Sequence, residues 1–238
     1  PNETLMKLNE NKFGALDTST VTVDRNVAVT IIDISGFTAL TETLLSTEAR
    51  EGASGAEQLI NHVNAYFNLI VEVVYENAGD VIKFAGDAMI CTFKGERCCM
   101  NAVACAYNIQ SKSTLSCYKK DGIELTLHVG VAFGDLSCHI VGGDQGKWFC
   151  LSTGKPYADL EIAVSSSGQG EVVITPAAKL GIEEEIKNSD DEVLIDFIET
   201  KDMYYKIKSF NSEDMELQQP QKERSQLIET FVNSGNKL

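Results

Sequence analysis

A short β-branched run that is followed at once by a carboxylate is the feature that most constrains this fold. Residues 27–32 are dense in valine and isoleucine, which favours a strand buried at the centre of a sheet. Asp33 ends the run, and Ile34 and a short Ser-Gly-Phe-Thr turn follow it. A carboxylate beside a core is costly to desolvate, so Asp33 either caps the next helix or binds a cation.

Helical and strand patterns alternate along the chain. Apolar residues at intervals of three and four predict a long amphipathic helix over 56–75. Further helices are predicted over 36–45, 97–115 and 156–164. Further strands are predicted over 81–84, 88–93, 125–133, 136–141, 148–151 and 172–175, with a closing hairpin over 193–198 and 203–207. We interpret 136–141 as the hairpin partner of 125–133. Frequent hairpins indicate an α/β (α+β) sandwich with a mixed or antiparallel sheet, not a doubly wound parallel sheet.

The domain organisation follows from shifts in polarity. Residues 1–25 are a polar leader, 26–208 form one domain, and 209–238 are a polar extension with an expected helix over 221–232. No run of about 18 apolar residues is present, so we expect no membrane span. We see no secretory signal and expect a cytoplasmic protein. Because the chain begins with Pro1, we expect it to be part of a longer polypeptide.

Charge and cysteine content exclude some function classes. The net charge of −15 argues against a nucleic-acid binder, although a metal ion could still attract a nucleotide. The seven cysteines form no CxxC pair, so we expect buried, reduced thiols. Cys98 and Cys99 fall at a helix start that favours a thiolate, which leaves core packing and redox sensing both open. The acidic stretches 183–185 and 190–192 predict a solvated loop face.

A second carboxylate, Asp87, lies in the turn of a separate predicted hairpin. Like Asp33 it has apolar neighbours, and a divalent cation such as Mg²⁺ or Mn²⁺ would offset the cost of burying both. The Ile34 carbonyl could add a ligand, and N–H groups at the helix start that follows Gly36 could hold an anion. Two metal ions and such a turn suit a triphosphate. The alternatives are a helix cap at Asp33 and a plain turn residue at Asp87.

These motifs resemble those of the class III adenylyl and guanylyl cyclases. The matching stretches are Ile32-Asp33-Ile34-Ser35-Gly36-Phe37-Thr38, Gly55-Ala56-Glu57-Gln58-Leu59 and Lys83-Phe84-Ala85-Gly86-Asp87-Ala88. The chain is most similar to the first cyclase domain of the bicarbonate-responsive soluble adenylyl cyclases, over about residues 26–208. The resemblance implies a ferredoxin-like βαββαβ core with additional C-terminal strands and a helix. It also implies head-to-tail pairing of two domains around ATP, which becomes cyclic AMP and pyrophosphate.

The resemblance also implies roles for individual residues. Asp33 and Asp87 would bind two Mg²⁺ or Mn²⁺ ions, and Ile34 would lend its carbonyl. The residues implied to cradle phosphate are Ser35, Gly36, Phe37 and Thr38. His128 stands where the family usually has an Arg or Lys that reaches the triphosphate, and its alternative is an ordinary strand histidine.

Three positions depart from the family pattern. Ala158 replaces an Asn and Ile162 replaces an Arg, both of which would steady the transition state, and Leu151 replaces an adenine-contacting residue. None of the three can donate a side-chain hydrogen bond. The chain is therefore expected to be a metal-donating half that needs a second cyclase domain. The alternatives are an inactive homology domain for dimerisation or nucleotide sensing, and half of a guanylyl cyclase.

The resemblance also implies a regulatory twin of the active site, here at Lys83, Ser152 and Glu161. In soluble adenylyl cyclases a Lys and an Arg at this site bind bicarbonate. Glu161 reverses the charge of that Arg, so we expect a weak or absent bicarbonate response. Lys83 could pair with Glu161, or it could be a solvated strand lysine.

Overall fold

A computed structural model describes residues 19–36, 42, 55–111, 118–120, 123–142, 148–189, 193–200 and 203–212. Statements about structure below concern these residues. The elements are β1 (Ser19–Ser35), α3 (Gly55–Glu76), β2 (Gly79–Ala85), β3 (Ala88–Phe93), α4 (Cys98–Ser111), β4 (Tyr118–Lys120), β5 (Ile123–Gly142), β6 (Trp148–Thr153), α6 (Lys155–Ser165), β7 (Val172–Ile174), α7 (Pro176–Lys187), β8 (Val193–Glu199) and β9 (Tyr205–Ser212).

The strands form a mixed sheet in the order β2-β3-β1-β5-β7-β9-β8, and β4 and β6 also pair with β5. β1 pairs antiparallel with β3 and with β5, and β3 pairs antiparallel with β2. β5 and β7 run parallel. With α3 and α4, these four strands have the order of a βαββαβ core, because each helix connects two parallel strands separated by a third. The predicted fold class and the mixed sheet are confirmed.

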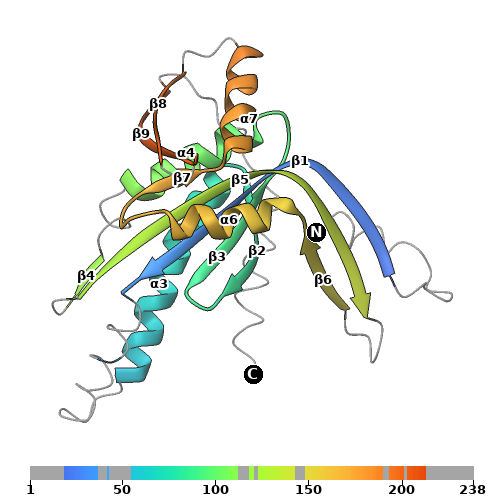
Figure 1. Ribbon diagram of the computed structural model, residues 1–238. Helices are drawn as coiled ribbons and strands as arrows, with labels where there is room; N and C mark the ends of the chain where they lie inside the picture. The colour runs from blue at the N-terminus through green and yellow to red at the C-terminus, as the bar shows by residue number, and fades with distance from the viewer. Residues whose placement is uncertain are drawn as a thin grey trace.

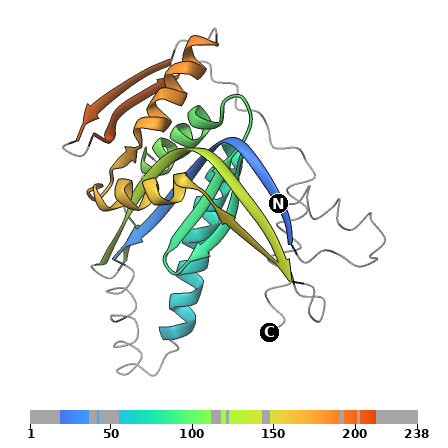
Figure 2. The ribbon, with the colours of Figure 1, turned by 45° about the vertical axis from the view of Figure 1, so that its right-hand side comes forward.

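Alternate residues of β1 face two different helical layers. Ile32 lies in a buried cluster with residues of α3 and α4, whereas Val29 packs with Leu160 of α6. Figure 1 shows α6 crossing in front of β1 and β5. Figure 2 shows the paired ends of β1 and β5 curving away from the helices, with β6 alongside β5. The strand is therefore covered on both faces, as its continuous apolar run predicts.

The predicted hairpin of 125–133 and 136–141 is wrong, because β5 is one continuous strand. The prediction took Gly134-Asp135 for a turn. Instead, β1 is long enough to pair on both sides of this point, with Val27 opposite Gly134 and Asp24 opposite Leu136. A bulge between Asp24 and Val27 accommodates the bend, and Asn26 adopts a φ of 54° there.

Helix α7 lies at Pro176–Lys187, where neither a helix nor a strand is predicted. Pro176 stands in its first turn, and the Thr175 hydroxyl accepts a hydrogen bond from the Ala178 N–H at 3.2 Å. The stretch 183–185 therefore lies on a helix, and the prediction of a loop face there is wrong. The acidic stretch 190–192 and the predicted helix over 221–232 lie outside the described residues.

The remaining predicted elements agree with the structure to within a few residues. β1 begins at Ser19, inside the predicted leader, and β9 runs to Ser212. The predicted helix over 36–45 lies almost wholly outside the described residues. Within the described ranges, no helix is long and apolar enough to cross a membrane.

Two neighbouring residues of α3 test the placement of the core. Ile70 is fully buried, whereas Leu69 is 41% exposed. Ile70→Ala is expected to lower the free energy of unfolding by about 2–5 kcal/mol, because it leaves a cavity between α3 and the sheet. Leu69→Ala, the matched control, is expected to cost well under half of that. Urea denaturation of both variants measures the difference, and equal losses would contradict the assigned orientation of α3.

Candidate active site

The pairing of β1 with β3 brings Asp33 and Asp87 together. Asp33 lies opposite Ala88 in the register, and Asp87 directly precedes Ala88 in the β2–β3 turn. Gly86 adopts a φ of 69°, a left-handed conformation that glycine tolerates at no steric cost and that closes this tight turn. Both carboxylates are half-buried. Two residues far apart in the sequence thus form one acidic site at a strand end.

The electrostatics of this site suit a cation. Partial burial first, and the negative charge of Asp87 second, raise the pKa of Asp33. His128 and the Ile34 N–H partly offset this effect. A carboxylate whose charge is disfavoured by burial and by a neighbouring carboxylate gains from a positive partner. Their oxygen donors fit a hard divalent ion such as Mg²⁺ or Mn²⁺.

His128 completes the site from the other side of β1. It lies opposite Asp33 in the β1–β5 register. The Ser167 hydroxyl donates to the Val164 carbonyl at 2.7 Å and lies 3.4 Å from His128 Nδ1. Among the described residues, Nε2 of His128 is buried without a hydrogen-bond partner. A buried polar atom without a partner is costly, so this nitrogen is suited to a ligand.

The turn after Asp33 is described as far as Gly36. The Ile34 side chain is buried in the core, which leaves only its backbone available to a cation. Ser35 is the last residue of β1. Gly36 has a φ of 94°, an unusual backbone angle of the kind that glycine permits. Phe37 and Thr38 lie outside the described residues.

The three substituted positions lie at the surface. Leu151 on β6 is 54% exposed, Ile162 on α6 is 46% exposed, and Ala158 is also exposed. Phe84, next to Lys83 on β2, is 50% exposed.

The residues of the twin site are also near the surface. Lys83 and Glu161 are exposed, and Ser152 is half-buried. No ion pair joins Lys83 to Glu161 in the described structure, so the possible pairing of these two residues is not observed.

Ser167 is a residue of this site that sequence reasoning missed. It holds His128 through Nδ1, but in the sequence it is one of three consecutive serines and carries no distinguishing signal. Only the approach of the α6–β7 connection to β5 reveals it.

Comparison with known proteins identifies the family. Residues 21–193, well over half of the chain, match the adenylate and guanylate cyclase catalytic domain. The chain therefore belongs to this family, whose members generally use two metal ions.

Two relatives are adenylate cyclase type 10 of Mus musculus and of Homo sapiens. Each is 31% identical over 150 residues, which cover 61% of this chain and 9% of the relative. The chain thus spans under a tenth of the length of these relatives.

Solved structures share the fold at low sequence identity. The guanylyl cyclase domain of the RhoGC fusion protein from Blastocladiella emersonii has a TM-score of 0.58 at 14% identity, covering 80% of this chain and 99% of that one. The adenylyl cyclase CyaB from P. aeruginosa has a TM-score of 0.56 at 17% identity, covering 82% and 96%. Both likenesses support the cyclase fold.

Replacing Asp33 by asparagine is expected to weaken the pH dependence of stability in the metal-free chain. Because the pKa of Asp33 is raised, the folded chain binds more protons than the unfolded chain between the ordinary and raised values. The wild type should therefore lose stability as the pH rises through this window. Asp33→Asn should not lose stability across this pH window. Above the window, the variant should be at least as stable as the wild type. Urea titrations in chelator from about pH 4 to about pH 7 measure the difference.

Asp24→Asn is the matched control, because Asp24 lies on the same strand but pairs with Lys94 at 2.6 Å. Asp24→Asn should retain the fall in stability with rising pH that Asp33 causes. If Asp33→Asn were less stable than the wild type at every pH, the charge of Asp33 would not be unfavourable in the folded chain.

Proposed function

We propose that this chain is the metal-donating half of a class III adenylyl cyclase. It would convert ATP to cyclic AMP and pyrophosphate when paired with a complementary cyclase domain. The juxtaposition of Asp33 and Asp87 is the observation that carries the proposal. With the Ile34 carbonyl, these residues would hold two Mg²⁺ or Mn²⁺ ions. Bound there, the ions would activate the ribose 3′-hydroxyl and neutralise charge on the triphosphate.

The other residues of the site would bind and orient the triphosphate. Ser35, Gly36, Phe37 and Thr38 would cradle the phosphates through the turn after β1. The buried Nε2 of His128 would contact a phosphate oxygen, with its ring fixed by Ser167. Together these groups would align the triphosphate for attack at the α-phosphate.

The complementary domain would come from the same polypeptide or from another chain. It would supply the adenine-selecting residues and the Asn and Arg that this chain lacks at Ala158 and Ile162. The exposed apolar side chains of Phe84, Leu151 and Ile162 support such a contact. The cyclase domain is proposed to span 26–208, within a cytoplasmic protein. ATP is favoured over GTP because the 31% identical relatives are adenylate cyclases.

Activity should depend on a partner domain. The chain alone, with ATP and Mg²⁺ or Mn²⁺, is expected to make no cyclic AMP above background, because it lacks transition-state donors worth about 10²–10³-fold each. A class III cyclase domain that carries the Asn and Arg should restore synthesis. In that mixture Asp33→Asn or Asp87→Asn should lower the rate on the order of 10²-fold or more. Asp24→Asn, the control, should not.

Robust synthesis by the chain alone would refute the claim that it is half a site. Mn²⁺-dependent ATP binding without product in any mixture would favour the inactive sensing or dimerisation module, and cyclic GMP from GTP would favour a guanylyl cyclase half. Bicarbonate at fixed pH should leave the rate unchanged, because Glu161 reverses the charge of the Arg implied at the twin site of Lys83 and Ser152. Dose-dependent stimulation would contradict that assignment.

His128→Lys tests the phosphate contact. A lysine carries a full positive charge, so affinity for ATP with Mn²⁺ is expected to rise on the order of tenfold, equivalent to about 1.4 kcal/mol. Equilibrium binding of a fluorescent ATP analogue measures the change. His139→Lys on the same strand is the control and should leave the affinity unchanged. An unchanged affinity in His128→Lys would show that the residue does not contact phosphate.

A further inference from the structure

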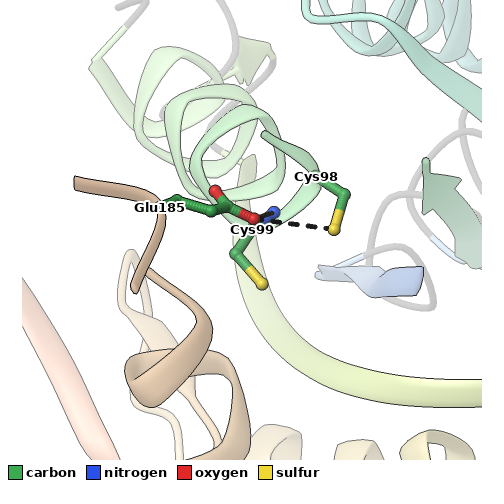
Figure 3. A group of neighbouring side chains, drawn as sticks. All are labelled: Cys98, Cys99 and Glu185. Carbon is green, nitrogen blue, oxygen red and sulfur yellow. Dashed lines mark hydrogen bonds between the residues drawn. The ribbon is translucent and has the colours of Figure 1, made fainter. Parts of the chain in front are cut away.

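Two adjacent cysteines and a glutamate form a second cluster of potential metal ligands, separate from the cyclase site. Cys98 and Cys99 begin α4, and Glu185 lies on α7 (Figure 3). One ligand atom from each residue lies within 4.8 Å of the other two. The proposed reaction uses none of these three residues.

We propose that Cys98 Sγ, Cys99 Sγ and a Glu185 carboxylate oxygen form a binding site for a thiophilic divalent cation, with Zn²⁺ the best fit. Sulfur ligands select Zn²⁺ over Mg²⁺, and Zn²⁺ accepts a carboxylate oxygen beside them. Such an ion would join two helices that are distant in the sequence.

The carboxylate is already held in place. Glu185 accepts hydrogen bonds from the backbone N–H groups of Cys99 at 2.9 Å and Met100 at 2.8 Å. The Cys98 sulfur lies 3.6 Å from the same carboxylate (Figure 3). Each carboxylate oxygen has two lone pairs, so both N–H contacts can persist while one oxygen binds an ion. Ligands oriented by other contacts lose little freedom on binding.

The Asn26 carbonyl of β1 would offer a fourth donor. The Cys98 sulfur lies 3.2 Å from the Asn26 carbonyl oxygen. Asn26 belongs to the bulge of β1 and has a φ of 54°. Two sulfurs, a carboxylate oxygen and this carbonyl, or a water in its place, would supply the four ligands that Zn²⁺ prefers. The ligands thus come from three separate elements.

The fold holds the sulfur atoms away from water. Cys98 is 2% exposed and Cys99 is fully buried. The Cys99 sulfur packs so closely on α7 that a Cβ atom at Gly181 would lie 2.6 Å from it. Glycine at this position therefore permits the approach of α4 and α7 that brings Glu185 to the cysteines.

The surroundings of Cys99 disfavour a thiolate in the metal-free chain. The hydrogen bond with Cys98, burial, and the negative charges nearby raise the pKa of the Cys99 thiol far above its usual range. Glu185 occupies the helix start that would otherwise favour a thiolate. Cation binding would form two sulfur–metal bonds and break two S–H bonds. Both protons would pass to solvent, and no electron would be transferred.

Cobalt substitution tests the site in the reduced 238-residue chain, with excess Mg²⁺ present to occupy the Asp33–Asp87 site. One Co²⁺ per chain is expected to bind with a thiolate-to-cobalt charge-transfer absorption, which oxygen ligands cannot produce. Binding should release two protons, and Zn²⁺ should displace the Co²⁺ and raise the melting temperature. Absence of the charge-transfer absorption in the folded wild-type chain would overturn the proposal.

Substitutions locate the ligands. Cys98→Ser and Cys99→Ser should each lose the charge-transfer absorption or shift it with a large loss of affinity. Glu185→Gln keeps an oxygen that can accept the N–H hydrogen bonds, and should weaken Co²⁺ binding at least about 10-fold. Cys105→Ser, a buried cysteine of the same helix, is the control and should bind as the wild type does. Circular dichroism verifies folding. Wild-type binding in all three folded cluster variants would also overturn the proposal.

Discussion

The pairing of β1 with β3 on one side and β5 on the other is the interaction on which the proposed site depends. Through this register Asp33 gains Asp87 as one neighbour and His128 as the other. The apolar run before Asp33 anchors the strand between two helical layers, which keeps the carboxylate half-buried. The fold thereby creates an unfavourable negative charge that a divalent cation would relieve.

The same arrangement explains why the chain is proposed to be only half of an active site. Acidic groups and a histidine converge at one end of β1, whereas the positions expected to hold transition-state donors carry Ala158 and Ile162. Ile162 and Leu151 expose apolar surface where a complete site would have hydrogen-bond donors. A partner domain would cover this surface and supply the missing groups, which couples assembly to activity.

The sequence predicted the elements whose signals lie within a short stretch of the chain. The helix at α3 and the hairpin of β2 and β3 follow from apolar periodicity and a glycine turn. The unbroken β5 was missed because Gly134-Asp135 suggests a turn, and only pairing with a distant strand keeps this stretch extended. Helix α7 was missed although Thr175 and Pro176 marked its start.

The functional residues show the same contrast between signals local in the sequence and contacts between distant segments. Asp33 and Asp87 stand out in the sequence as carboxylates among apolar residues, and the resemblance of their motifs assigned them a shared role. Ser167 and Glu185 could not be found in this way, because each acts through a contact between segments far apart in the chain. These contacts depend on how the α6–β7 connection packs on β5 and how α7 packs on α4.

Electron paramagnetic resonance of bound Mn²⁺ tests the central claim most directly. With a non-hydrolysable ATP analogue, we expect two Mn²⁺ ions per chain that are close enough for their spins to couple. Asp33→Asn and Asp87→Asn should each abolish the coupled signal, because both carboxylates serve both ions. Two uncoupled ions, or a coupled pair that survives either substitution, would contradict the claim that Asp33 and Asp87 form one metal site.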